Sequence, residues 1–281
     1  MIPGLAHATS VGGGSICDAY RGEWRGRTVF AKTLRHPPRG FFEAEEHGLR
    51  WLGAVGAPVP EVLHVAADVL ILEWVEAGSP TRAAAERFGR DLADLHACNA
   101  PAFGAGWPGY IGSLPMDNAT TYAAPDEWPA FYTEQRVLPF LRLAVDDGAI
   151  DDRGQRAVEE VCERLADLAG PPEPPRHIHG DLWSGNVLWT GKGRGVADGR
   201  VRLIDPAAHG GHRETDLAML ALFGFPQLDA VLGAYRERFP LADGWEQRRD
   251  LHQLHPLLVH AALFGRSYGS RVTSLARRLL S

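Results

Sequence analysis

The segment RHIHGDLWSGNVLW, residues 176–189, constrains the fold of this chain more than any other stretch. Asp181 in this segment is followed five residues later by Asn186, and a short apolar run at 201–204 ends in a second aspartate, Asp205. Polar side chains set between apolar strands carry a free-energy cost unless they are hydrogen-bonded or used in a site. We therefore expect these three residues to share a functional role. The alternative is that residues 179–181 form a turn and Asn186 a cap.

Protein kinases use the same order of polar residues: an Asp, an Asn five residues later, and an Asp at the end of a later strand. In those enzymes the first Asp accepts or orients the proton of the acceptor hydroxyl, and the other two residues hold Mg²⁺ on the phosphates. By this pattern Asp181 is the candidate catalytic residue. Asn186 and Asp205 are the candidate Mg²⁺ ligands.

A glycine-rich segment near the N-terminus, VGGGSI at residues 11–16, predicts a phosphate-binding turn. Glycines let backbone N–H groups approach phosphate oxygens without interference from a Cβ. We expect a strand, this turn, a second strand, and a third strand that carries Lys32, whose ammonium would bind the phosphates of a nucleotide. The candidate contacts are Gly13, Gly14, Ser15 and Lys32. A flexible hairpin is the alternative, and a Walker loop is excluded because no Gly-Lys-Ser/Thr follows.

Residues 41–52 have the apolar spacing of a helix, which places Glu45 on or beside the buried face. An acid there needs a partner, and a Lys–Glu ion pair orders the phosphate-binding lysine of kinases. We predict that Glu45 pairs with Lys32. The alternative is that Glu43, Glu45 and Glu46 only solvate the helix.

Two short strands are expected at 62–63 and 69–72, and the second leads into residues 73–78. In a kinase-like layout this stretch links two lobes. The backbone groups near Glu73 and Val75 would then pair with adenine, although an ordinary strand end would have the same sequence.

The rest of the chain is predicted to be mainly helical, with helices over 81–97, 128–143, 151–169, 217–223, 228–239 and 248–264. The segment 101–128 is rich in Gly, Pro and aromatic residues, and we expect an ordered lid or a segment that faces the substrate. His96 is expected to be a buried structural residue. Asp216 would cap its helix.

These elements predict an α+β, protein-kinase-like fold with two lobes. Residues 1–78 would form a small, β-rich, nucleotide-binding N-lobe. Residues 79–281 would form a larger, mostly helical C-lobe that carries the catalytic and substrate-binding groups.

Composition and charge argue against several classes of protein. A formal net charge of −6 argues against a nucleic-acid-binding protein that relies on bulk charge. The three scattered cysteines indicate a reducing compartment. The sequence MIPGLAHATS does not resemble a signal peptide, and no apolar run approaches the length of a membrane span. We expect a cytoplasmic protein that is a monomer or a weak dimer and that contacts neither nucleic acid nor membrane.

With these motifs the chain resembles the fructosamine kinases (ketosamine-3-kinases), a branch of the aminoglycoside-phosphotransferase-like kinases. The most specific match is HGDLWSGN at 179–186, because the wider superfamily shares HGD and the Asn whereas the intervening WSG is characteristic of this branch. The resemblance covers nearly the whole chain. Further matching segments are 12–16, 29–32, 42–45, 72–74, 92–96, 103–104, 110–112, 204–207, 214–218, 220–225 and 253–265.

The resemblance implies ATP-dependent phosphorylation of the 3-hydroxyl of ketosamines, the ribulosamine and fructosamine adducts that form when sugars condense with protein amines. The phosphorylated product is unstable and releases the amine, which amounts to deglycation. The resemblance also implies that Mg²⁺ is required, that Lys32 and Glu45 hold the phosphates, and that Asp216 braces the catalytic loop. Trp183 would line the sugar site, with simple packing as the alternative, and Asp216 is counted with it among the expected substrate-site residues.

Two departures from the family pattern fall within 101–128: Pro108-Gly109-Tyr110 replaces an Asp-Asn pair, and no tryptophan lies between Asn118 and Trp128. Two other functions stay open. One is a kinase of another small alcohol, such as an aminoglycoside or an amino-alcohol. The other is a noncatalytic nucleotide-binding regulator. Cys17, near the glycine-rich segment, is a hypothetical redox switch, with a small strand residue as the alternative.

Overall fold

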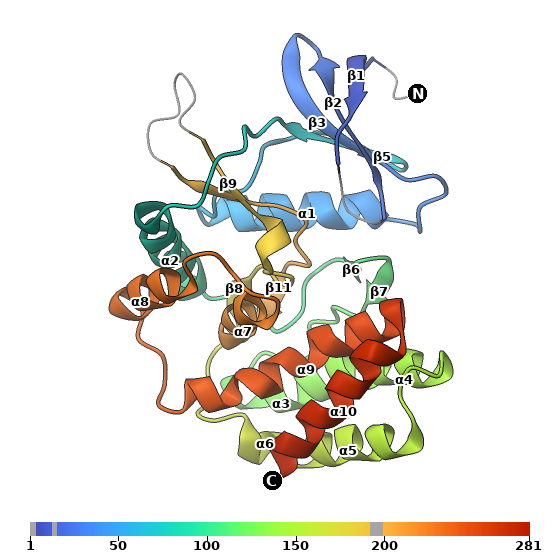
Figure 1. Ribbon diagram of the computed structural model, residues 1–281, viewed down its shortest axis with the longest axis vertical. Coiled ribbons are helices and arrows are strands. Elements are labelled where there is room, and N and C mark those ends of the chain that lie inside the picture. Colours follow the sequence, from blue (N-terminus) through green and yellow to red (C-terminus); the bar gives the residue numbers. More distant parts are fainter. Residues whose placement is uncertain (1–3, 13–15, 192–198) are drawn as a thin grey trace.

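The computed structural model describes residues 4–12, 16–191 and 199–281. Its N-terminal region is an antiparallel sheet in the order β1-β2-β3-β5-β4, and helix α1, Phe41–Ala54, lies between this sheet and the rest of the molecule (Figure 1). The strands are β1 (Ala6–Ser10), β2 (Asp18–Trp24), β3 (Arg27–Thr33), β4 (Val62–Ala66) and β5 (Val69–Glu73).

A two-residue turn sets the register of the central strands. Arg25 and Gly26 connect β2 to β3 with φ values of 51° and 75°. Consecutive positive φ values are typical of a type I′ turn, whose twist matches that of antiparallel strands. The turn brings Lys32 opposite Ala19 on β2. The predicted order of three strands, with the lysine on the third, is confirmed.

Helix α1 buries one apolar face against the sheet, where Phe42 and Leu49 pack with Leu70 and Leu72 of β5. These residues follow the helical spacing that the sequence shows. The predicted helix is confirmed, and its buried face leaves Glu45 beside β3.

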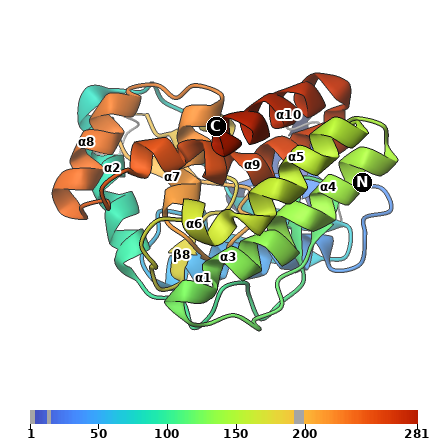
Figure 2. The same cartoon turned by 90° about the horizontal axis from the view of Figure 1, so that it is seen from below.

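The C-terminal region is mainly helical and packs around two hydrophobic cores (Figure 2). Helices α2 and α8 pack together on one side, and α4, α5, α9 and α10 form a group on the other. The helices are α2 (Arg82–Ala97), α3 (Trp128–Phe131), α4 (Leu138–Asp146), α5 (Asp152–Glu163), α6 (Leu165–Leu168), α7 (Glu214–Leu222), α8 (Leu228–Arg238), α9 (Trp245–Phe264) and α10 (Arg266–Leu280).

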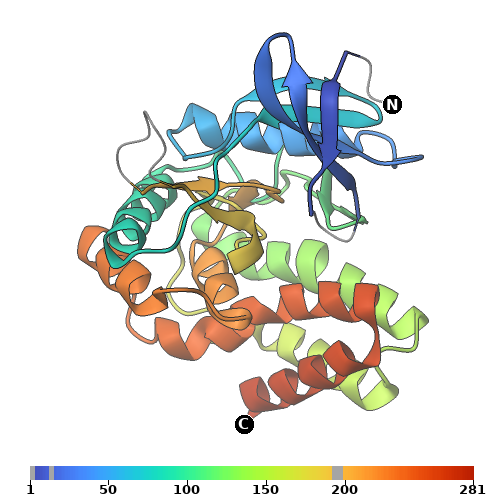
Figure 3. The same cartoon turned by 45° about the horizontal axis from the view of Figure 1, so that its top comes forward.

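Short strand pairs connect these helices to the N-terminal region. The hairpin β6–β7 lies against α1, between the sheet and the helices (Figure 3). The other pairs, β8–β11 and β9–β10, carry the HGDLWSGN motif and the segment around Asp205. The strands are β6 (Gly109–Ile111), β7 (Leu114–Met116), β8 (Arg176–Ile178), β9 (Val187–Trp189), β10 (Val201–Leu203) and β11 (His209–Gly211).

Some helix boundaries differ from the predictions. The helix expected over 128–143 is interrupted by a π-helical stretch, Tyr132–Val137, which turns Arg136 inward. The guanidinium of Arg136 donates hydrogen bonds to the backbone carbonyl of Asp117 and to Oδ1 of Asn118, which fastens the segment 101–128 to the helices. Arg136 and Asp117 are 19 residues apart, so the local hydrophobic periodicity could not indicate this contact.

Other helices differ from the predictions as well. The helix expected over 151–169 is broken at Arg164, and α9 begins three residues before the predicted start. Helix α10 was not predicted. It is separated from α9 by Gly265, whose φ of 84° allows the chain to turn between two long helices.

Candidate active site

A cavity of about 1190 Å³ lies between the sheet with α1 and the C-terminal helices. The residues that the sequence singled out line this cavity from both sides. From the N-terminal region these are Lys32, Glu45, Glu73 and Val75, and from the C-terminal region Asp181, Trp183, Asn186 and Asp205. Gly13, Gly14 and Ser15 lie outside the described residues.

The segment after β8 forms a tight loop that presents Asp181 to the cavity. Gly180 has a φ of 82°, and a Cβ at this position would lie 2.2 Å from the carbonyl oxygen of Ala207. A glycine is therefore required here. The ring of His179 donates from Nε2 to the carbonyl of Ile204 over 2.9 Å, which ties this loop to the segment that carries Asp205.

The carboxylate of Asp216 fixes the backbone of the loop that carries Asp181. Its carboxylate accepts hydrogen bonds from the backbone N–H groups of His179 at 2.7 Å and Gly180 at 2.9 Å, and from Nε2 of His96 at 3.1 Å. The predictions that Asp216 caps a helix and that it belongs to the substrate site are wrong, because Asp216 is fully buried and does not line the cavity. Helix α7 begins two residues earlier, at Glu214, and the Asp216 side chain points to the loop instead. His96 is fully buried, as predicted.

These hydrogen bonds keep Asp216 ionised. Burial alone would raise the pKa of this carboxyl, but the hydrogen bond from His96 and the other donors lower it overall. A buried carboxylate with three donors is a rigid acceptor, so the backbone of the loop has one defined position.

Asp181 and Asn186 are in direct contact. Nδ2 of Asn186 donates to the backbone carbonyl of Asp181 over 2.8 Å and to its carboxylate over 3.1 Å. Burial and the nearby carboxylate of Asp205 raise the pKa of Asp181 to about 7, although the hydrogen bond from Asn186 opposes this shift. A carboxyl with a pKa near neutral is well suited to exchange a proton with a substrate.

Lys32 lies between two carboxylates. Its Nζ contacts the two oxygens of Glu45 at 2.7 and 2.9 Å and also forms an ion pair with Asp205. Burial alone would lower the pKa of Lys32, but the two carboxylates raise it overall. The predicted pairing of Lys32 with Glu45 is present, and it distinguishes Glu45 from Glu46, which pairs with Arg50 instead.

Asp205 and Asn186 offer oxygen atoms at the same end of the cavity. Asp205 has a φ of 53°, a left-handed conformation that aspartate adopts more readily than most residues. The Nδ2 atom of Asn186 is used in hydrogen bonds, which leaves its Oδ1 as a possible ligand. Carboxylate and amide oxygens are suitable ligands for Mg²⁺.

The stretch after β5 lines the opposite end of the cavity. Glu73 lines the cavity, and its side chain lies 3.6 Å from Arg202. Its backbone N–H already donates to the carbonyl of Glu61 over 2.9 Å. Among the described residues, no hydrogen bond uses the peptide groups of Val75. An unpaired N–H and C=O beside a cavity can pair with a heterocycle such as adenine.

Aromatic residues line the remaining part of the cavity. Trp183 is 39% exposed, and a Cβ at Gly185 would lie 2.3 Å from its ring, so the ring packs over this glycine. From the segment 101–128, Trp107 and Tyr110 line the same space, which supports the expectation that this segment is ordered and faces a substrate.

Four aromatic residues that line the cavity were not predicted from the sequence: Phe223, His260, Phe264 and Tyr268. They come from the end of α7 and from α9 and α10, so they converge only when these helices pack together. The available signals were the similarities of residues 220–225 and 253–265 to the family, and neither segment includes Tyr268.

Cys17 also lines the cavity. Burial raises the pKa of its thiol to about 11, although Lys32 opposes the shift. The group is therefore a protonated thiol at neutral pH, which is a poor nucleophile.

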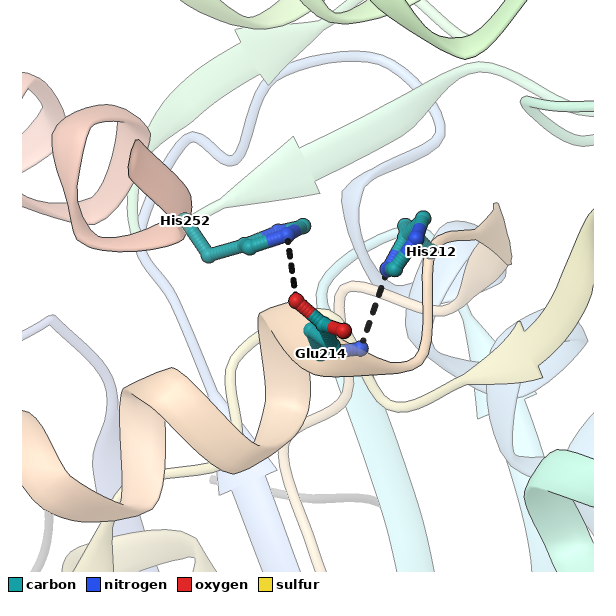
Figure 4. Close-up of side chains that lie close together, drawn as sticks. All are labelled: His212, Glu214 and His252. Atoms are coloured by element: carbon teal, nitrogen blue, oxygen red, sulfur yellow. Dashed lines mark hydrogen bonds and ion pairs between the residues drawn. The ribbon is translucent and has the colours of Figure 1, made fainter. Parts of the chain in front are cut away.

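A second cluster of titratable groups consists of His212, Glu214 and His252 (Figure 4). Their potential ligand atoms lie within 4.8 Å of one another. However, both oxygens of Glu214 already accept from Arg248, and Nδ1 of His212 accepts from the backbone N–H of Glu214. Arg248 already neutralises the charge of the Glu214 carboxylate, so the cluster anchors the first turn of α7 to α9.

Among the described residues, no helix has both the length and the apolar character that a membrane crossing requires.

The comparisons with known proteins agree with this geometry. The family model for fructosamine kinase matches residues 4–281. A crystal structure from Thermobifida fusca, of a protein assigned as a fructosamine-3-kinase, is 50% identical and covers 98% of this chain and 94% of its own, with a TM-score of 0.90. A probable ketoamine kinase of Enterococcus faecium is 35% identical over 94% of this chain and 91% of the relative. The chloroplastic protein-ribulosamine 3-kinase of Arabidopsis thaliana is 31% identical over 95% and 80%, respectively.

More distant structures share the fold. The aminoglycoside phosphotransferase APH(4)-Ia, in a ternary complex with ADP and hygromycin B, is 15% identical and covers 98% of this chain and 94% of its own, with a TM-score of 0.64. At this identity the likeness concerns the fold alone, and it confirms the predicted kinase-like class. The match along residues 4–281 settles the relationship. The chain belongs to the fructosamine kinase family and is a kinase.

Proposed function

We propose that this protein uses ATP and Mg²⁺ to phosphorylate the 3-hydroxyl of ketosamines, such as ribulosamine and fructosamine adducts. The observation that carries the proposal is the position of Asp181, whose pKa is raised to about 7, in one cavity with the Lys32–Glu45 ion pair. The names of the ketoamine and ribulosamine kinases with which the chain aligns support the substrate class.

In the proposed reaction, Asp181 accepts a hydrogen bond from the sugar hydroxyl and receives its proton. The hydroxyl oxygen forms a bond to the γ-phosphorus of ATP while the bond from that phosphorus to the bridging oxygen breaks, and ADP leaves. Such a transfer needs mainly positioning and electrostatic stabilisation. The rigid Asp216 contacts supply the positioning, because they fix the loop that carries Asp181.

The residues present fit a magnesium ion. Asp205 and Oδ1 of Asn186 would hold it, and when bound it would neutralise charge on the phosphates. Lys32 would contact the phosphates with Glu45 as its support. This requires the ion pair between Lys32 and Asp205 to open, since both groups would then face the nucleotide.

The nucleotide would lie along the N-terminal sheet. We propose that adenine pairs with the backbone near Glu73 and Val75 and that Gly13, Gly14 and Ser15 contact the phosphates. Residues 1–78 would then act as the nucleotide-binding N-lobe and residues 79–281 as the C-lobe for catalysis and substrate binding. Trp183 would line the sugar site beside Asp181.

The product follows from the chemistry of the adduct. A ketosamine 3-phosphate is unstable and releases the amine, so the reaction would remove sugar adducts from amines. We propose that the physiological role is deglycation.

The experiment is a measurement of ATP consumption with Mg²⁺ against ribuloselysine, fructoselysine, an aminoglycoside and no acceptor. Turnover of a ketosamine that is lost in Asp181→Asn would support the proposal and would rank the two sugars. Turnover of the aminoglycoside alone would move the function to another small alcohol. ATP binding without turnover of any acceptor would indicate a noncatalytic regulator.

A further inference from the structure

Five aromatic side chains form a continuous surface beside Asp181, which we call the aromatic wall: Trp183, Phe223, His260, Phe264 and Tyr268. His260 is at its centre, with its ring centroid 4.8 Å from that of Phe223, 4.9 Å from Tyr268 and 5.5 Å from Phe264. Trp183 joins the wall through an edge contact with Phe223 at 6.5 Å. The wall therefore begins two residues from the catalytic candidate.

The aromatic wall is unusual in its exposure. Among the described residues, only three large hydrophobic side chains are exposed: Leu143 at 37%, Trp183 at 39% and Phe264 at 55%. Two of these three line the same cavity. Exposed aromatic rings that gather in a cavity leave apolar area uncovered, and a ligand with apolar groups can cover it.

The wall also carries one positive charge. The guanidinium of Arg271, on α10, lies 5.6 Å from the ring centroid of Phe223 and 5.5 Å from that of Tyr268. Arg271 is exposed and forms no ion pair with the other described residues. Arg271 does not itself line the cavity, but its contacts with Phe223 and Tyr268, which do, place the cation beside the aromatic wall, where it is available for an anion.

His260 does not compete for that anion. Its Nδ1 donates to the backbone carbonyl of Pro256 over 2.7 Å, and burial, together with Arg271, lowers the pKa of the ring. His260 is therefore neutral at physiological pH, and Arg271 is the cation of this surface.

We propose that the aromatic wall and Arg271 form a subsite for the amine-derived part of the ketosamine, which favours adducts of free amino acids with an apolar side chain and an unblocked carboxylate. The inference rests on the proposed function and names its substrate class. In a ketosamine the nitrogen is attached to C1, two carbons from C3. With the 3-hydroxyl at Asp181, the amine-derived part therefore begins close to Trp183 and extends along the wall.

The two features of the subsite recognise two parts of such an adduct. An apolar side chain would cover the exposed rings, and the carboxylate next to the nitrogen would pair with Arg271. An adduct on a protein lacks this free carboxylate: at the N-terminal amine the neighbouring carboxyl is part of a peptide bond, and at a lysine Nε no carboxylate lies next to the nitrogen. The subsite thus distinguishes small adducts from those on proteins.

The test uses four adducts of one ketose, made with phenylalanine, phenylalaninamide, glycine and glycinamide. The acids and amides differ in the carboxylate, whereas phenylalanine and glycine differ in the ring. We expect the wild-type protein to have a KM about fivefold lower for each acid than for its amide. Arg271→Gln should abolish this ratio, and Arg277→Gln, an exposed arginine on the same helix, should keep it.

Phe264→Ala tests the rings in the same assay. We expect it to raise the KM for the phenylalanine adducts about fivefold while the glycine adducts change little. Leu143→Ala removes an exposed apolar side chain that does not line the cavity and should have no such effect. Loss of folding in any variant would lower the turnover of all four adducts and is thereby recognised.

The outcomes separate the inference from the function on which it rests. Equal KM values for acids and amides in the wild-type protein, with clear turnover of both, would overturn the carboxylate subsite and leave the ketosamine kinase intact. No turnover of any of the four adducts, or of the lysine adducts above, would overturn both. An acid preference that Arg271→Gln leaves unchanged would assign the carboxylate to another residue and refute the role of Arg271.

Discussion

The Nδ2 amide of Asn186 lies 3.1 Å from a carboxylate oxygen of Asp181, so the two polar residues of the HGDLWSGN motif are hydrogen-bonded to each other. The contact fixes the side chain of Asp181 in the cavity. It also orients the amide so that Oδ1 is left for another ligand. One hydrogen bond thus connects the candidate proton acceptor to the candidate magnesium site.

Asp181→Asn should lower kcat by about 10²- to 10⁴-fold, because an amide cannot accept the hydroxyl proton. The Kd for ATP should change little, since the carboxylate lies on the acceptor side of the cavity. The rate of ADP formation at saturating substrate measures kcat, and calorimetric titration with ATP measures the Kd. Near-wild-type turnover in this variant would remove Asp181 from the catalytic role.

The pKa of Asp181 predicts the pH dependence. Burial and the carboxylate of Asp205 raise this pKa to about 7, and only the ionised form accepts a proton. We expect kcat/KM to rise about tenfold per pH unit below this value and to reach a plateau above it. The profile is measured between about pH 5.5 and about pH 9. A constant kcat/KM through neutral pH would contradict the assignment.

Glu45→Gln should raise the KM for ATP by about tenfold, because Lys32 would lose one of the two carboxylates that hold it. The KM for the sugar acceptor should change less. Glu46→Gln on the same helix is the matched control, since Glu46 pairs with Arg50 instead. Equal effects of the two substitutions would show that the Lys32–Glu45 contact is not specific to nucleotide binding.

Asp216→Asn should reduce the free energy of unfolding by about 2–4 kcal/mol, because the buried acceptor of two backbone N–H groups is weakened. It should also lower kcat, since the loop that carries Asp181 loses its support. Denaturant unfolding measures the first effect. Asp94→Asn is the control: Asp94 forms an exposed ion pair with Arg238, worth less than about 1 kcal/mol.

Activity should be the same with and without a thiol reductant. Burial raises the pKa of the Cys17 thiol to about 11, so little thiolate is present at neutral pH. The test is kcat after mild oxidation, with and without subsequent reduction, in the wild-type protein and in Cys17→Ser. A reversible loss of activity that Cys17→Ser removes would instead establish the redox switch.

The sequence determined the groups that carry the chemistry. Asp181 and Asn186 could be recognised because one loop between β8 and β9 fixes their spacing, and Asp205 because it follows β10, which pairs with β9. The hairpin that leads to Lys32 is local as well, since the Arg25–Gly26 turn sets its register. Local spacing and turn geometry are properties of neighbouring residues, so they can be read along the chain.

Tertiary structure decided which residues surround these groups. Helical spacing placed Glu45 on or beside the apolar face but left open that Glu43, Glu45 and Glu46 only solvate the helix, and the packing of α1 against β3 brings Glu45 to Lys32. The sequence around Asp216 indicated a helix cap, and only the family resemblance implied a role at the catalytic loop; in the structure its carboxylate faces the backbone N–H groups of that loop, more than 30 residues away.

The aromatic wall shows the same limit. Phe223, His260, Phe264 and Tyr268 lie on three helices, and each one could equally have been a core residue in the sequence. Their convergence on one cavity depends on how α7, α9 and α10 pack. This packing depends on side chains that are distant in sequence. The sequence alone therefore determined the groups for the reaction, whereas the surface that would select the substrate forms only in the folded molecule.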